Sequence, residues 1–103
     1  MSSANEAAIK VIVELQAKPG KRVELENLLE SVAAKYGPSQ PGFLDSTRYE
    51  VLDNPNILVE IADWASAEVR AAAMQQAMAE SAYAPLEELL AAPFKATVIR
   101  QLP

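Results

Sequence analysis

Few side chains of this sequence suit proton transfer or the wall of a binding pocket, and two of them are close neighbours. Glu60 and the only tryptophan, Trp64, end an apolar run over 57–64 that stops just before a helix start at Ser66. A carboxylate becomes a general base near neutral pH when burial raises its pKa. A tryptophan at the end of a strand is a usual residue at the rim of a pocket. Glu60 is therefore a candidate base and Trp64 a candidate pocket wall.

Each of these two residues also has a purely structural interpretation. Strand alternation predicts that Glu60 faces away from the helices, where an ion pair with Arg48 or Lys95 would be its role. A β-bulge before Trp64 would reverse that facing. Trp64 fits equally well as a packed tryptophan whose indole N–H needs only a hydrogen-bond partner.

Composition excludes several classes of chemistry and partner. The 103 residues include no cysteine and no histidine. Disulfides and thiolate chemistry are therefore absent, and metal and haem sites lose their commonest ligands, so we predict no metal and no cofactor. The net charge of −5, without a basic cluster, argues against a nucleic-acid partner. Since no apolar run reaches membrane-spanning length and residues 1–7 resemble no signal peptide, we expect a soluble cytoplasmic protein whose residues 1–7 are disordered.

The elements that must position Glu60 and Trp64 follow from the hydrophobic period. Alternating apolar residues predict four strands, and apolar residues spaced by three and four predict two long helices, followed by a short helix that starts at Pro85. The turn between the second and third strands is predicted over 53–56. This order predicts a single α+β domain over 1–103 with the ferredoxin-like βαββαβ topology and an antiparallel four-stranded sheet. The strands are 9–16, 43–52, 57–64 and 94–100, and the long helices are 21–36 and 66–80.

The two faces of the predicted sheet differ in composition. One is almost wholly apolar and should lie beneath the helices, with Ile9, Val11, Val13, Leu15, Phe43, Tyr49, Val51, Ile57, Val59, Ile61, Phe94 and Val98. The other mixes aliphatic residues with charges of both signs, among them Ile12, Leu58, Ile99, Arg48 and Glu60. Such a face suits a second copy of the chain, so we predict a homodimer that a lysine at Leu58 would split. A solvated face with scattered aliphatic residues is the alternative.

Three segments of the chain resemble the antibiotic biosynthesis monooxygenase family of dimeric α+β barrels. They are 17–21 (AKPGK) before the first helix, 49–56 (YEVLDNPN) before the third strand, and 63–66 (DWAS) at the start of the second long helix. The resemblance covers 9–100. It implies a dimeric α+β barrel with a pocket in each subunit between the sheet and its helices. It also implies oxidation of a phenolic or quinol substrate by molecular oxygen without flavin, haem or metal.

The resemblance carries over to some positions and fails at others. Trp64 matches the family tryptophan, whereas Ala62 stands where many relatives have glutamate. Glu60 stands where one oxygenase type has asparagine, and Ala72 or Ala73 where relatives often have histidine. The retained tryptophan favours a monooxygenase-like enzyme. The lost proton-transfer groups favour a non-enzymatic ligand-binding or stress-response dimer on the same scaffold.

Four further residues are candidates for contact with a small aromatic substrate. Tyr49 and Tyr83 each carry a hydroxyl able to hydrogen-bond a phenol, although an amphipathic core tyrosine is the commoner explanation. Met74 and Met78 lie one helical turn apart and fit core filling or a soft pocket wall. The alanine-rich helix around them either packs closely on the sheet or leaves a cavity open.

Overall fold

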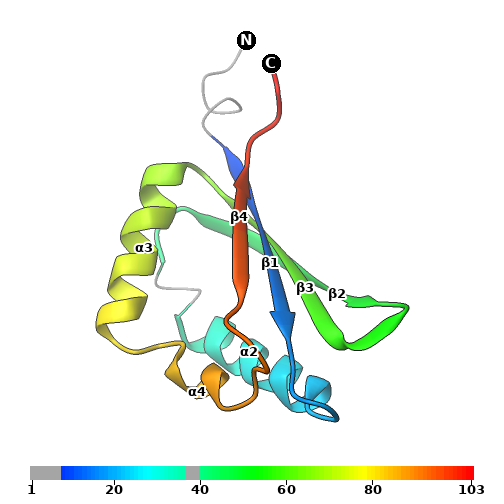
Figure 1. Cartoon of the computed structure of the whole chain (residues 1–103). Helices are drawn as coiled ribbons and strands as arrows, with labels where there is room; N and C mark the ends of the chain where they lie inside the picture. The colour runs from blue at the N-terminus through cyan, green and yellow to red at the C-terminus, as the bar shows by residue number, and fades with distance from the viewer. Residues whose placement is uncertain (1–7, 37–39) are drawn as a thin grey trace.

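The chain forms one antiparallel sheet with helices on one side of it (Figure 1). This computed structural model describes residues 8–36 and 40–103, so the predicted disorder of 1–7 lies outside the described residues. The strand order is β2-β3-β1-β4, and every neighbouring pair is antiparallel. The ferredoxin-like prediction is thereby confirmed. In chain order the elements are β1 (Ile9–Gln16), α2 (Arg22–Tyr36), β2 (Phe43–Val51), β3 (Asn54–Trp64), α3 (Ala67–Ala79), α4 (Ala84–Glu87) and β4 (Lys95–Ile99).

Local backbone and side-chain contacts define both ends of helix α3. The Oγ of Ser66 accepts a hydrogen bond from the backbone N–H of Val69 at 3.2 Å, which caps the amino end as predicted. At the other end Ser81 has a φ of 54°, a left-handed conformation that ends the helix and turns the chain towards α4. No helix in the described part of the chain is long and apolar enough to cross a membrane.

The β2–β3 hairpin is tighter than the sequence predicts. Val51 pairs with Asn54, so the turn is Leu52-Asp53 and the predicted turn over 53–56 is wrong. Asn54 Oδ1 accepts the backbone N–H of Asn56 at 3.1 Å, as turn chemistry suggests. However, the carbonyl of Asn56 also accepts the N–H of Ala17 at 2.7 Å. This bond draws the segment into the sheet, and β3 therefore starts before Ile57.

The facing of β3 is the main correction to the sequence prediction. Leu58 pairs with Leu15 of β1 and is only 1% exposed, within the core beneath the helices. Alternation then places Glu60, Ala62 and Trp64 on that same face, and Ile57, Val59 and Ile61 on the other. This facing requires no bulge in β3. Both faces of the strand are apolar, so its pairing with β1 determines which face lies beneath the helices. A lysine at Leu58 would therefore disrupt the core rather than split a dimer.

The core beneath the helices consists of two apolar clusters. The first joins Leu15 and Leu58 to Leu25 of α2 and Leu86 of α4, and the second packs around Trp64. Val13 packs against both clusters, and its partner across the ladder is Glu60. The junction between the clusters therefore has a carboxylate on its floor.

The opposite face of the sheet carries no helix in the described residues and mixes apolar side chains with polar and charged ones. Tyr49 pairs with Val59 on this face and is 49% exposed, so its predicted position beneath the helices is wrong. The register gives the face the apolar residues Ile12, Tyr49, Val59, Ile61 and Ile99, together with Glu14, Thr47 and Lys95 and an ion pair between Lys10 and Asp63 on the two central strands.

Candidate functional site

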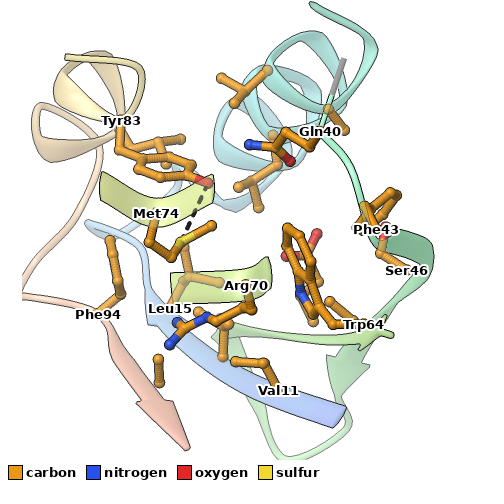
Figure 2. A pocket seen from close by; sticks show the side chains of 18 residues that line it. Val11, Leu15, Gln40, Phe43, Ser46, Trp64, Arg70, Met74, Tyr83 and Phe94 are labelled. Atoms are coloured by element: carbon orange, nitrogen blue, oxygen red, sulfur yellow. Dashed lines mark hydrogen bonds between the residues drawn. The ribbon is translucent and has the colours of Figure 1, made fainter. Parts of the chain in front are cut away.

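A cavity of about 120 Å³ lies between the sheet and the helices, where the two core clusters meet (Figure 2). An apolar cavity of about 150 Å³ holds a benzene ring, so this space, which is partly open to the surface, encloses one ring of an aromatic substrate. Most of its wall is aliphatic and aromatic, and it includes residues of all four strands. Its polar or chemically reactive lining residues are Gln40, Ser46, Glu60, Trp64, Arg70, Met74 and Tyr83.

The indole of Trp64 is held in place at one side of the cavity. It is buried and meets the Phe43 ring edge-to-face, with ring centroids 5.3 Å apart and planes at 72°. Gly42, just before Phe43, has a φ of 84° and lies so close to α3 that a Cβ there would be 2.8 Å from Cβ of Val69. Its carbonyl accepts the N–H of Ala65 at 2.8 Å. The glycine therefore lets this loop dock against the start of α3 and fixes both aromatic rings.

Glu60 is the carboxylate among the cavity-lining residues that the structure describes. It shares a face of β3 with Trp64, roughly 13 Å along the strand at about 3.3 Å per residue. Ala62 lies between them in the lining, and its small side chain leaves space in the cavity above the sheet. Arg48 pairs with Glu60 across the ladder, with Nε 3.3 Å from Oε2, and its Nη1 lies 3.6 Å from Oε1 of Glu30 on α2. The first contact is an ion pair without hydrogen-bond geometry, so the buried Nε of Arg48 lacks a hydrogen-bond partner among the described residues.

Opposing effects set the pKa of Glu60, and burial is the largest. Loss of solvent raises the pKa of this carboxyl above 4.5, while the neighbouring Arg48 guanidinium lowers it, and the net direction is upward. A carboxyl shifted in this direction holds a proton more readily than an ordinary surface glutamate. Glu60 therefore has the environment of a general base or acid.

Tyr83 and Met74 form the wall between α3 and α4. The Tyr83 hydroxyl donates to the Met74 Sδ at 4.0 Å, drawn as a dashed line in Figure 2. The ring of Tyr83 also meets Phe94 edge-to-face at 6.3 Å. Burial raises the pKa of Tyr83, the charge of Glu60 raises it further, and the charge of Arg70 lowers it. The charges of Glu60 and Arg70 thus act on the Tyr83 phenol in opposite directions.

The structure brings together four of the six residues predicted for the site. Glu60, Trp64, Met74 and Tyr83 line the cavity, whereas Tyr49 lies on the other face of the sheet. Met78 is 75% exposed and also lies outside the cavity, because α3 turns this position outward to solvent. Within residues 8–36 and 40–103, there is no group of three or more carboxylate, histidine or cysteine side chains that could hold a metal ion.

Three polar lining residues were not predicted. Ser46 enters from β2 and Gln40 from the loop before it, and neither has a periodic signal in the sequence. Arg70 had such a signal, because it precedes Met74 by four residues and so shares its face of α3.

The fold and the site together define a ferredoxin-like α+β protein with an apolar, ring-sized pocket between sheet and helices. The model of the antibiotic biosynthesis monooxygenase family matches residues 8–84, and the chain belongs to this family. No match was found among curated protein sequences.

Solved structures from several organisms share this fold. A conserved protein from Methanosarcina mazei Go1 is 24% identical, with a TM-score of 0.82 over 99% of this chain and 100% of that one. A mutant of SnoaB, a cofactor-independent oxygenase from Streptomyces nogalater, is 21% identical, with a TM-score of 0.78 over 92% and 93%. Rv0793 from Mycobacterium tuberculosis is 23% identical, with a TM-score of 0.77 over 94% and 97%. At these identities the similarity shows the fold.

Proposed function

We propose that this protein is a cofactor-free monooxygenase that oxidises a small phenolic or quinol compound in the cavity beside Trp64. The observation that carries the proposal is the position of Glu60, a desolvated carboxylate on the floor of an apolar, aromatic-walled cavity. Family membership supports the reaction class, and the fold shared with a cofactor-independent oxygenase agrees with it.

The proposed reaction converts a ring methylene in the keto form of a phenol into a carbonyl. Glu60 removes one of the two methylene protons, and the carbanion that results, delocalised onto the ring oxygen as a phenolate, reduces molecular oxygen and forms a C–O bond to it. Protonated Glu60 returns its proton to give a hydroperoxide. Loss of the remaining ring C–H proton to Glu60 breaks the O–O bond, and hydroxide leaves with that proton as water. The balance is CH₂ plus O₂ to C=O plus H₂O, with Glu60 regenerated.

Trp64 and the apolar wall have a separate role in this proposal. A flat indole fixed by Phe43 orients the substrate ring by stacking. The aliphatic wall keeps water from the reactive carbanion, which water would otherwise protonate. Both effects raise the fraction of bound substrate that reacts with oxygen.

Oxygen uptake with anthrone and reduced quinones in metal-free buffer tests the proposal. We expect uptake above the rate of spontaneous oxidation for the wild type, and a fall for Trp64→Phe, which keeps an aromatic ring but loses the indole. Uptake at the spontaneous rate, together with binding of the same compounds, would assign the protein to the second candidate, a non-enzymatic ligand-binding dimer. The ion pair of Arg48 with Glu60 favours that candidate, because it occupies the carboxylate.

We also propose that two copies of the chain pair through the open face of the sheet. The support is a face that no helix covers among the described residues, where Val59, Ile61 and Ile99 lie beside charges of both signs, including Glu14, Lys95 and the pair Lys10–Asp63. Burial of such a face against its own copy removes apolar area from water and leaves the helix-side cavity of each subunit intact.

A further inference from the structure

Arg70 is a charged residue of the cavity lining that has no role in the proposed reaction. It lies in the second turn of α3, is half-buried and lines the cavity. Figure 2 shows its side chain on the Phe94 side of the cavity, opposite Trp64. In the described part of the chain, its guanidinium has no hydrogen bond and no ion pair. A half-buried arginine without an acidic partner has donors left over for a ligand.

The charges around the cavity leave Arg70 uncompensated. Arg48 and Glu60 offset each other within their ion pair, and Arg48 also reaches Glu30. Arg70 therefore contributes a positive charge at an apolar cavity of a protein whose net charge is −5. Apolar walls strengthen the field of such a charge, because they hold less screening water than an open surface. The charge of Arg70 also opposes the rise in the pKa of Tyr83, which is another residue of the cavity lining.

We propose that the ligand of this cavity is an aromatic compound that bears an anionic oxygen, a carboxylate or an ionised phenol, and that Arg70 binds this oxygen. The proposal rests on the proposed function, because it concerns the same cavity. The ring lies between Trp64 and the wall formed by Met74 and Tyr83, and its anionic oxygen points to the side of Phe94. A guanidinium binds such an oxygen through a fork of N–H donors. Arg70 would then also stabilise the phenolate that forms when Glu60 takes a proton.

A matched pair of single-ring ligands tests this assignment. The probes are 4-hydroxybenzoate and its neutral isostere 4-hydroxybenzamide, titrated into the protein at pH 7. The indole N–H resonance of Trp64 reports binding, because the chain has one tryptophan and that residue lines the cavity. The variants are Arg70→Gln, Arg70→Lys and the control Arg100→Gln, which removes the same charge from an exposed position outside the cavity lining.

We expect the wild type to bind the benzoate more tightly than the benzamide. Arg70→Gln should weaken benzoate binding about tenfold, the scale of one charge-assisted hydrogen bond, and leave benzamide binding within about twofold. Arg70→Lys should restore part of the preference, and Arg100→Gln should keep all of it. Unchanged benzamide binding also shows that Arg70→Gln is folded.

Three outcomes would overturn the proposal. Equal affinity of the wild type for both probes, or an equal loss of both in Arg70→Gln, would show that Arg70 only covers apolar surface with its methylene stem. In either case the cavity still binds an aromatic ring and the proposed function stands. Absence of any Trp64 shift with both probes would overturn the role of Arg70 and the proposed function together.

Discussion

Arg48 and Glu60 are cross-strand partners whose ion pair, 3.3 Å from Nε to Oε2, lies on the helix-covered face of the sheet. The side chains are 21% and 20% exposed, so both charges have lost most of their water. The pair holds a carboxylate at an apolar cavity, where an unpaired charge would be costly. Burial and Arg48 together determine the pKa of Glu60, so substitution of Glu60 and changes of pH test its role.

Replacement of Glu60 by glutamine should remove most of the proposed catalysis. A glutamine keeps the size of the side chain but accepts no proton, and loss of a general base lowers rates by roughly 10²–10⁴. Oxygen uptake with anthrone measures the effect. Glu87→Gln is the matched control, because Glu87 is exposed on α4 and lies outside both the cavity lining and the open face of the sheet. Equal uptake by wild type and Glu60→Gln would rule out Glu60 as the base.

The pH dependence of uptake should follow the raised pKa of Glu60. The base must be ionised, so uptake should fall as the pH drops through the pKa of this carboxyl, which burial places above 4.5. The pH profile of kcat/KM for anthrone oxidation measures it in the free enzyme. A profile that stays flat down to pH 4.5 would contradict the assignment.

The same shift predicts how stability depends on pH. Because the folded-state pKa of Glu60 is raised, its contribution to the free energy of unfolding is fully present below pH 4.5, where both states are protonated. As the pH rises, the unfolded chain ionises first, and this contribution is lost by the time the folded carboxyl ionises. Urea unfolding from pH 4 to 8 should show a steeper fall for the wild type than for Glu60→Gln. Parallel curves would mean that Glu60 titrates like an exposed glutamate.

Gly42 should tolerate alanine less well than Gly20, although both have a positive φ. A Cβ at Gly42 meets the side chain of Val69, whereas nothing lies within 4 Å of one at Gly20. Gly20→Ala should cost about 1 kcal/mol of unfolding free energy from backbone strain, and Gly42→Ala roughly 2–4 kcal/mol. Chemical denaturation measures both. Equal costs would show that the loop shifts freely away from α3.

Ile61→Lys should split the proposed dimer. A lysine there places a charge in the centre of the open face without touching the core beneath the helices. Sedimentation should show a mass of twice the 11.1 kDa subunit for the wild type and of one subunit for Ile61→Lys. Val23→Lys on α2, an exposed apolar position on the helix side, should remain a dimer. A monomeric wild type would refute pairing through this face.

The sequence by itself determined the order of the elements, the ferredoxin-like topology and the family. The order and the topology depend on local period and helix signals, because β1 alternates cleanly and Ser66 caps α3, and the family followed from the resemblance of three segments. It did not determine the facing of β3. Leu58, Ala62 and Trp64 are as apolar as Ile57, Val59 and Ile61, so the period of two is satisfied either way.

Only the tertiary structure decided that facing, through the pairing of Leu15 with Leu58 in the core. That register moved Glu60 from the open face into the cavity, and a register shift between Phe43 and Asp45 of β2 turned Tyr49 away from the helices. The cavity itself arises where two apolar clusters meet, and its lining comes from all four strands, three helices and three of the connections between them. No pattern within one segment predicts such a space, because its shape depends on how separate elements pack together.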